Sequence, residues 1–216
     1  MTGIRRLRDA PDRDAALDQY RRRADVYDVE LAVFEPLRRK AVALLGLQPG
    51  ATVIDAGCGT GLSFGLLHAA IGRKGRIVGI EQSPEMCAKA RARVAAEHWS
   101  NVGLVEQPVE LARLEGRPAD AALFHFTHDV LRRPEAIANV LGHLRPGARV
   151  VAVGLKWASP LMWPVNLFVL SAALRSVTSL EGLAAPWSHL HAQLGAIEVE
   201  PALFGAAYIA CGTTPP

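Results

Sequence analysis

Apolar and polar positions follow one another along this chain with two different periods. Between residues 17 and 34, apolar side chains recur at steps of three and four, at Tyr20, Ala24, Tyr27, Leu31 and Phe34. This spacing puts them on one face of an α-helix, so an amphipathic helix is predicted over this region. A second helix is predicted from Pro36, which suits the first turn of a helix, to Gly46, which suits its end.

Beyond residue 50, short aliphatic runs alternate with helical patterns. The runs are "TVIDAG", "GRIVGIE", "NVGLVEQ", "ADAALFHFT" and "RVVAVGL", and "RPGA" is predicted to form a turn before the last of them. This alternation predicts a parallel sheet with helices on both faces, an α/β fold. The final runs, "AIEVEPAL" and "AAYIACG", are separated by Phe204 and Gly205 and should form a hairpin with one antiparallel strand. We expect a single domain over residues 1–216.

One segment, residues 157–174, carries no Asp, Glu, Lys or Arg and reaches the length of a membrane-spanning helix. Pro160 and Pro164 interrupt it, and strand-like sequence follows that must rejoin the fold. We therefore expect a buried helix or lid, within an apolar substrate-side insert at residues 156–185. A membrane span and an interfacial element are the alternatives.

Composition narrows the class of protein. Half of the 216 residues are hydrophobic, which is ample for a core, and the net charge of +3 is too small to indicate a nucleic-acid partner. The segment "IRRLRDAPDRDAALDQYRRRAD" mixes both signs, which favours a solvated helical face over a membrane-binding one. The opening residues lack the apolar run of a signal peptide, and the three cysteines show neither pairing nor metal spacing. We expect a cytoplasmic protein with no metal site.

The stretch "VIDAGCGTG", residues 53–61, follows the first predicted strand. It lacks the Lys-Ser/Thr pair of a phosphate-binding P-loop, and Leu62 stands where a dinucleotide fingerprint needs its third glycine. The spacing Asp-x-Gly-x-Gly-x-Gly fits better, with glycines that allow a ligand to approach the backbone closely. Asp55 would offer an acceptor to a cationic amino group.

These residues resemble motif I of the class I S-adenosylmethionine-dependent methyltransferases. The resemblance covers nearly the whole chain, and it implies a Rossmann-like seven-stranded sheet of order 3-2-1-4-5-7-6. It also implies S-adenosylmethionine as methyl donor, S-adenosylhomocysteine as product, and contacts from Gly57, Cys58 and Gly59. The second strand, in "GRIVGIEQSPEMCAKAR", supplies Glu81, for which the resemblance implies hydrogen bonds from both ribose hydroxyls.

The resemblance implies further cofactor contacts. Gln82 would lie beside the adenine and Met86 would cover one of its faces. The third strand, "LVEQPVEL", lacks the Asp that many relatives use for the adenine amino group. Either the side-chain oxygen of Gln107 or backbone groups near Pro108 and Val109 would then accept that bond.

The end of the fourth strand, "DAALFHFTHDVL", lies where the family's substrate meets the methyl group. His128 or Asp129 is the candidate base or acceptor-orienting group, and simple helix capping with a surface histidine is the alternative. His125 would line the methionine end of the cofactor. The motif Asn/Asp-Pro-Pro-Tyr is absent here, which argues against DNA bases and glutamine as acceptors, and no metal cluster suggests a magnesium-dependent mechanism.

The opening "YRRRADVYDVELAVFEPLRRKAVALL" resembles that of bacterial phosphatidylethanolamine N-methyltransferases and related quinone methyltransferases. The resemblance implies that residues 1–46 form a helical lid, with Tyr20 or Tyr27 near the sulfonium, to which aromatic faces are attracted. Alternatively, both tyrosines only pack the helix onto the domain. The apolar insert favours a small lipophilic acceptor, a phospholipid amine or a quinone-like molecule, and peripheral contact with a membrane.

Two other functions remain open at this point. A non-catalytic S-adenosylmethionine-binding regulatory protein would need the same binding residues, and only methyl-transfer turnover would separate it from an enzyme. A nicotinamide-dependent oxidoreductase would prefer NAD to S-adenosylhomocysteine, and Leu62 counts against it.

Overall fold

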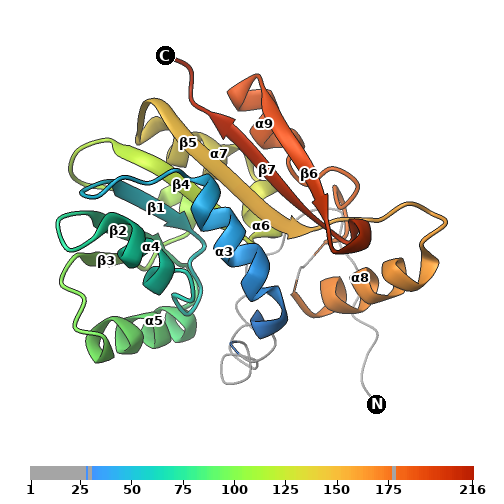
Figure 1. Ribbon diagram of the computed structural model, residues 1–216, viewed down its shortest axis with the longest axis horizontal. Coiled ribbons are helices and arrows are strands. Elements are labelled where there is room, and N and C mark those ends of the chain that lie inside the picture. Colours follow the sequence, from blue (N-terminus) through green and yellow to red (C-terminus); the bar gives the residue numbers. More distant parts are fainter. Residues whose placement is uncertain (1–27, 29–30, 177–178) are drawn as a thin grey trace.

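A computed structural model describes residue 28, residues 31–176 and residues 179–216. Its centre is a seven-stranded sheet of order β3-β2-β1-β4-β5-β7-β6, which confirms the predicted order (Figure 1). The strands are β1 (Thr52–Ala56), β2 (Arg76–Ile80), β3 (Val102–Val105), β4 (Ala119–His125), β5 (Leu144–Leu155), β6 (Ile197–Ala202) and β7 (Ala207–Thr213).

Helices cover both faces of this sheet, as the alternating pattern predicted. The α-helices are α3 (Glu35–Leu44), α4 (Phe64–Ile71), α5 (Pro84–Ala96), α6 (His128–Leu131), α7 (Pro134–Gly142), α8 (Trp163–Ser176) and α9 (Ser188–Leu194). Short 3-10 turns are η1 (Ala32–Phe34), η2 (Val109–Leu111) and η3 (Leu203–Gly205). Buried residues of α3 and α4 join one hydrophobic core, and those of α7 and α9 join a second core. α3 and α7 lie on opposite faces of the sheet (Figure 1).

Strand directions also follow the prediction. β1 is parallel to β2 and β4, and β3 and β5 extend the parallel sheet at either side. β7 is antiparallel to both β5 and β6, so the last two strands form the expected hairpin. The carboxyl ends of β1, β2 and β4 therefore meet at one edge of the sheet, where α/β folds bind ligands.

The N-terminal helices agree with the sequence as far as they are described. Most of the helix predicted over residues 17–34 lies outside the described residues, and its last three form η1. α3 has Pro36 in its first turn. Gly46 follows the helix end with φ of 60°.

Two predictions about local structure are wrong. The predicted "RPGA" turn lies inside β5, where the pairing moves from Ala119↔Leu144 to Ala121↔Arg149, so the segment loops out of the strand as a bulge. Of the buried helix or lid predicted here, the structure contradicts the burial of α8. Its Ala173 is buried, but Trp163 is 69% exposed. The described residues contain no helix long and apolar enough to cross a membrane.

The ring of Phe64 supports the turn that follows β1. Phe64 is fully buried, and a Cβ added to Gly61 or Gly79 would lie 2.6 Å or 2.8 Å from its ring atoms. We expect Phe64→Ala to lower the free energy of unfolding by about 3–5 kcal/mol, because it leaves a cavity in the core. Urea denaturation measures this. Leu111→Ala, at a side chain that is 60% exposed, is the control and should change stability by less than about 0.5 kcal/mol. A loss below about 1 kcal/mol for Phe64→Ala would contradict the assigned packing.

Candidate functional site

The glycine turn begins at the carboxyl end of β1. Gly57, Gly59 and Gly61 have φ of 76°, 56° and 77°, in the left-handed region that favours glycine. A Cβ on Gly57 would lie 2.5 Å from Cγ2 of Thr127, just beyond β4. Glycine is needed at this position both for the backbone conformation and for the close approach of the two strand ends.

Several N–H groups of the turn already have protein acceptors. Gly57 and Cys58 donate to the carbonyl of Ile80 at 2.8 Å and 2.9 Å, and Gly59 donates to Oε2 of Glu81 at 2.9 Å. A loop that cradles phosphate instead turns such groups toward the anion. The turn therefore fits a ligand held mainly by side chains, in agreement with the rejection of the P-loop.

Glu81 connects three parts of the site. Its second oxygen, Oε1, accepts from the N–H of Ser83 at 2.7 Å, at the start of α5. Burial raises the pKa of this carboxyl, although the N–H groups of Ser83 and Gly59 act in the opposite direction. A carboxylate offers about four acceptor positions, so Glu81 has the capacity to accept hydrogen bonds from a ligand hydroxyl as well as from the backbone.

Asp55 and Arg38 are two buried charged residues whose side chains lack full partners. Asp55 is 1% exposed and its Oδ2 has no hydrogen-bond partner. Burial raises its pKa to about 7, against the opposing charge of Arg38. Arg38 is 3% exposed and its Nη2 also has no partner.

The sequence analysis missed Arg38, which stands in a run of basic residues typical of a solvated surface. The sequence did hold one signal for the burial of Arg38, namely its spacing from apolar residues of the same helix. It lies four residues after Phe34 and three before Ala41, both of which are buried, and so it falls on the inward face of α3.

The residues predicted at the end of β4 occupy different environments. Nε2 of His125 is shielded from solvent without a partner, and burial lowers the pKa of this ring to about 3, with a smaller effect from Arg38. His128 is buried, and its Nε2 lies 3.0 Å from the carbonyl of Glu181. Burial lowers its pKa to about 4. The alternative of a surface histidine is wrong, while Asp129 is half-buried in the first turn of α6.

The residues that were predicted to contact adenine lie around the start of α5 and η2. Met86 and Val109 are buried, and Gln82 is half-buried. Pro108 immediately precedes η2. Oε1 of Gln107 accepts from the N–H of Arg113 at 3.1 Å, so in this structure it stabilises its own loop.

Asp28 joins the N-terminal region to the turn, which the sequence analysis also missed. The hydroxyl of Thr60 donates to Oδ1 of Asp28 at 2.5 Å, and Nη2 of Arg93 lies 2.6 Å from Oδ2. Arg93 in turn donates to the carbonyl of Thr60 at 3.0 Å. Tyr20 and Tyr27, predicted near the sulfonium, lie outside the described residues.

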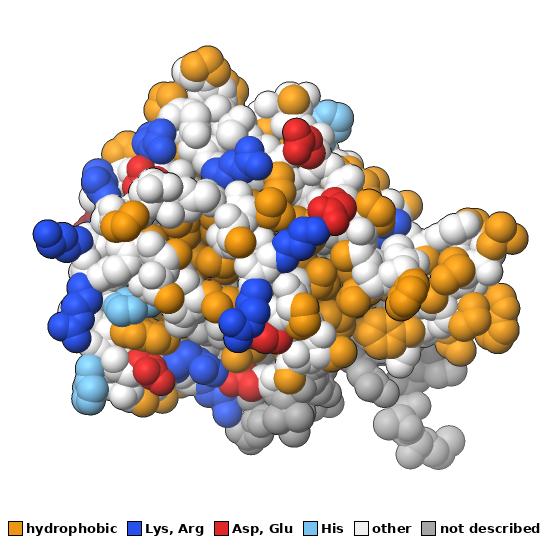
Figure 2. Space-filling view, in the orientation of Figure 1, with side chains coloured by type: hydrophobic (Ala, Val, Ile, Leu, Met, Phe, Trp, Pro, Cys, Tyr) orange, Lys and Arg blue, Asp and Glu red, His pale blue; other side chains and the backbone are white. Residues whose placement is uncertain are grey.

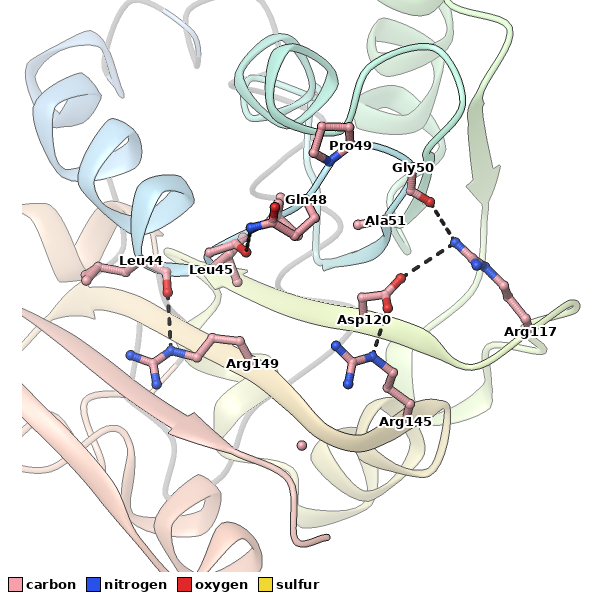
Figure 3. Close-up of a pocket in the computed structure, with 13 residues that line it drawn as sticks. Leu44, Leu45, Gln48, Pro49, Gly50, Ala51, Arg117, Asp120, Arg145 and Arg149 are labelled. Carbon is pink, nitrogen blue, oxygen red and sulfur yellow. Dashed lines mark hydrogen bonds and ion pairs between the residues drawn. The ribbon is translucent and has the colours of Figure 1, made fainter.

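A cavity of about 600 Å³ lies at the opposite edge of the sheet, by the amino ends of β1, β4 and β5 (Figure 3). Its charged side chains are engaged with the protein. Asp120 pairs with Arg117 at 3.7 Å and Arg145 at 2.8 Å, and Arg149 donates to the carbonyl of Leu44 at 3.2 Å. These contacts join the strand ends to one another and to the end of α3. In the described part of the chain, no group of three or more His, Cys, Asp or Glu could hold a metal ion.

Comparisons with known proteins find a methyltransferase domain and several methyltransferases among the similar proteins. Residues 53–147 match the family model described as Methyltransferase domain. The chain is 33% identical over 137 residues to an uncharacterized 37.1 kDa protein in transposon TN4556 of Streptomyces fradiae, covering 62% of this chain and 39% of that protein. It is 28% identical to the 2-phytyl-1,4-naphtoquinone methyltransferase of Thermosynechococcus vestitus, over 77% and 74% of the two chains. The chain spans less than half the length of several of its curated relatives.

A solved structure shares the fold. A SAM dependent methyltransferase from Aquifex aeolicus has a TM-score of 0.57 and 19% identity, over 82% of this chain and 88% of that one.

The contacts of Glu81 give a direct test of the site. We expect Glu81→Ala to weaken S-adenosylhomocysteine binding by about 1.5–3 kcal/mol, the range for hydrogen bonds to a charged group. Isothermal titration calorimetry measures the affinity, and Glu106→Ala, a surface carboxylate paired with Arg91, is the control. Unchanged affinity in the Glu81 variant would overturn the assignment of this residue.

The buried acid and arginine without full partners, the two-oxygen acceptor at Glu81 and the left-handed glycine turn all suit a nucleoside that carries an amino acid. The sheet order and the match over residues 53–147 agree with this reading. Residues 53–147 match a methyltransferase domain, and together with the fold this match supports a class I S-adenosylmethionine-dependent methyltransferase.

Proposed function

We propose that this protein transfers a methyl group from S-adenosylmethionine to a small lipophilic acceptor, a phospholipid amine or a quinone-like molecule. The observation that carries the proposal is an exposed apolar surface on the insert that follows β5. The insert is attached to the end of β4 through Glu181, whose carbonyl lies 3.0 Å from His128 and whose carboxylate lies 3.0 Å from Arg132. The apolar surface and the end of β4 thus belong to one edge of the molecule.

The apolar α8 surface consists of side chains that are 38–90% exposed, namely Leu161, Met162, Trp163, Leu167, Phe168 and Leu174. Figure 2 shows hydrophobic side chains gathered over α8, at the right of the view. No charged residue interrupts residues 157–174. Exposed apolar patches of this kind mark binding surfaces, and a Trp-containing helix without charges suits the boundary of a lipid layer. We therefore propose that the protein is cytoplasmic and contacts a membrane peripherally.

The reaction needs alignment more than proton transfer. When bound, S-adenosylmethionine supplies an activated methyl group on its sulfonium, and holding the acceptor in line with it accounts for much of the rate. His128 is neutral at neutral pH because its pKa is about 4. With Nε2 engaged by Glu181, its unpartnered Nδ1 can accept a hydrogen bond from the acceptor. We assign His128 and Asp129 this orienting role.

The N-terminal segment would complete the site. We propose that residues 1–46 act as a lid over the cofactor, within a single domain, with Tyr20 or Tyr27 near the sulfonium. The contacts of Asp28 with Thr60 and Arg93 support this arrangement, because they fix one residue of the segment on the glycine turn.

Methyl-labelled S-adenosylmethionine tests the proposal with a bacterial membrane extract as the source of acceptors. We expect label in the organic phase, and none with Gly59→Val, because a β-branched side chain does not tolerate the φ of 56° at this position. We expect Trp163→Ser/Leu167→Ser to lower organic-phase transfer about tenfold or more while S-adenosylhomocysteine affinity stays within about twofold, since the surface lies outside the cofactor site.

Leu111→Ser is the matched control, an exposed leucine on η2. Label confined to the aqueous phase would contradict a lipophilic acceptor. No transfer at all, with cofactor binding intact, would favour the non-catalytic regulatory protein.

A further inference from the structure

Arg132, the residue that follows α6, is a largely buried arginine that connects the end of β4 to the insert. Its side chain is 13% exposed, and its Nη2 lies 3.0 Å from Oε1 of Glu181. Its Nη1 lies 3.2 Å from Nε2 of His189 on α9. A surface ion pair contributes little to stability, whereas burying an arginine costs free energy unless its partners are well placed. The burial of Arg132 therefore requires an explanation beyond a surface ion pair.

The carboxylate that binds Arg132 belongs to a short arm, residues 179–183, which follows α8 along the chain. Gly182 of this arm has φ of 76°, and a Cβ added there would lie 2.7 Å from Nη1 and 2.8 Å from Nε of Arg132. Glycine thus allows the backbone of the arm to lie directly on the guanidinium. Leu183 is buried, and its carbonyl accepts from the N–H of Trp157 at 2.9 Å, near the start of the insert. The two ends of the insert are therefore joined to each other, and the arm rests on Arg132.

The same arm determines which nitrogen of the His128 ring carries the proton. Nε2 of His128 lies 3.0 Å from the carbonyl of Glu181, and a carbonyl can only accept a hydrogen bond. Nε2 must therefore carry the proton, and in the neutral ring Nδ1 then has a free lone pair. Nδ1 is shielded from solvent and has no hydrogen-bond partner. His128 and Arg132, four residues apart, thus hold Glu181 from one side of the helix.

We propose that Arg132 is a positioning residue for methyl transfer. By holding Glu181, it keeps the carbonyl of that residue against Nε2 of His128, so that Nδ1 accepts a hydrogen bond from an O–H or N–H group of the methyl acceptor. The proposal rests on the orienting role proposed above for His128. Arg132 acts through Glu181 and His128 and not on the acceptor itself.

Loss of the ion pair would allow the arm to move away from the ring. The ring proton would then exchange between Nε2 and Nδ1, because neither nitrogen would have a fixed hydrogen-bond acceptor. A ring that carries its proton on Nδ1 presents a donor to the O–H or N–H of the methyl acceptor, which it cannot orient. The reacting atom is then no longer held in line with the methyl group, and such misplacement lowers the rate of transfer without weakening cofactor binding.

Nitrogen NMR of the ring tests the proposal without any methyl acceptor. In nitrogen-15-labelled wild type at about pH 7, we expect the signals of His128 to be those of a neutral ring with its proton on Nε2 alone. In Arg132→Gln we expect the signals of a mixture of both tautomers. The signals of His128 are those that are missing from the spectrum of His128→Gln.

Transfer from methyl-labelled S-adenosylmethionine to a bacterial membrane extract gives a second readout, with label counted in both phases. We expect Arg132→Gln to lower the initial rate about tenfold or more, while S-adenosylhomocysteine affinity measured by calorimetry stays within about twofold. Glu181→Ala should also lower the rate, and the double variant should lose no more than Arg132→Gln, because the two residues act as one pair. Glu106→Ala, at a surface carboxylate paired with Arg91, is the matched control and should change the rate by less than about twofold.

An unchanged ring tautomer or an unchanged rate in Arg132→Gln would overturn the proposal. An equal loss of transfer and of S-adenosylhomocysteine affinity would also overturn it, because Arg132 would then only maintain the fold. Where Arg132→Gln does not fold, Glu181→Ala decides by the same measurements, since the side chain of Glu181 is 55% exposed. The expected losses with label confined to the aqueous phase would support the role of Arg132 and contradict the lipophilic acceptor. An absence of transfer in the wild type would overturn both.

Discussion

The carboxylate of Glu81 accepts N–H bonds from Gly59 and Ser83, and the geometry of the cofactor site depends on this arrangement. It connects the end of β2 to the glycine turn after β1 and to the first turn of α5. The turn can then keep its left-handed glycines close to the end of β4, where a Cβ on Gly57 would meet Thr127. The side chain that we expect to bind ribose thus also organises the backbone around it.

Without a bound ligand, the site contains a buried carboxyl group, that of Asp55, whose charged form is unfavourable. The pKa of Asp55 is raised from 3.8 to about 7 chiefly by burial, so the fold disfavours the charged form. For an acid whose pKa is higher in the folded protein, stability decreases as pH rises above the unfolded pKa, and the loss is complete above the folded pKa. Near neutral pH the free protein therefore bears a cost that a bound ammonium would relieve. Such costs are typical of binding sites that are prepared before the ligand arrives.

The sequence was sufficient to predict the sheet order and the glycine turn, because both depend on local patterns. Alternating strands and helices define the parallel sheet, and the glycine spacing after Asp55 defines the turn. The residues it missed, Arg38 and Asp28, are charged, and charged residues in a mixed run are usually solvated. Their roles depend on contacts across the fold, such as that of Asp28 with Thr60, which no local pattern encodes.

The failure at α8 has a related cause. An uncharged run predicts burial, but it does not say what will cover the helix, and here Ala173 is buried while Trp163 is exposed. The "RPGA" segment was misread for a different reason: Gly147, with φ of 70°, forms a bulge within the strand where a turn was expected.

The most direct test of the central claim is proton release on cofactor binding. S-adenosylhomocysteine should be titrated calorimetrically at about pH 6 and about pH 8, in buffers of different ionisation enthalpy. Among the described residues, Arg38 of α3, Glu81 just beyond β2 and Cys58 of the glycine turn interact electrostatically with Asp55. With a pKa of about 7, the carboxyl of Asp55 is mostly protonated at the lower pH. An ammonium bound there favours the carboxylate, so we expect release of close to one proton and about tenfold weaker binding at about pH 6 than at about pH 8. Asp55→Asn should remove this dependence. Equal affinity at both pH values in the wild type, without proton release, would contradict the assignment of Asp55 as the ammonium ligand.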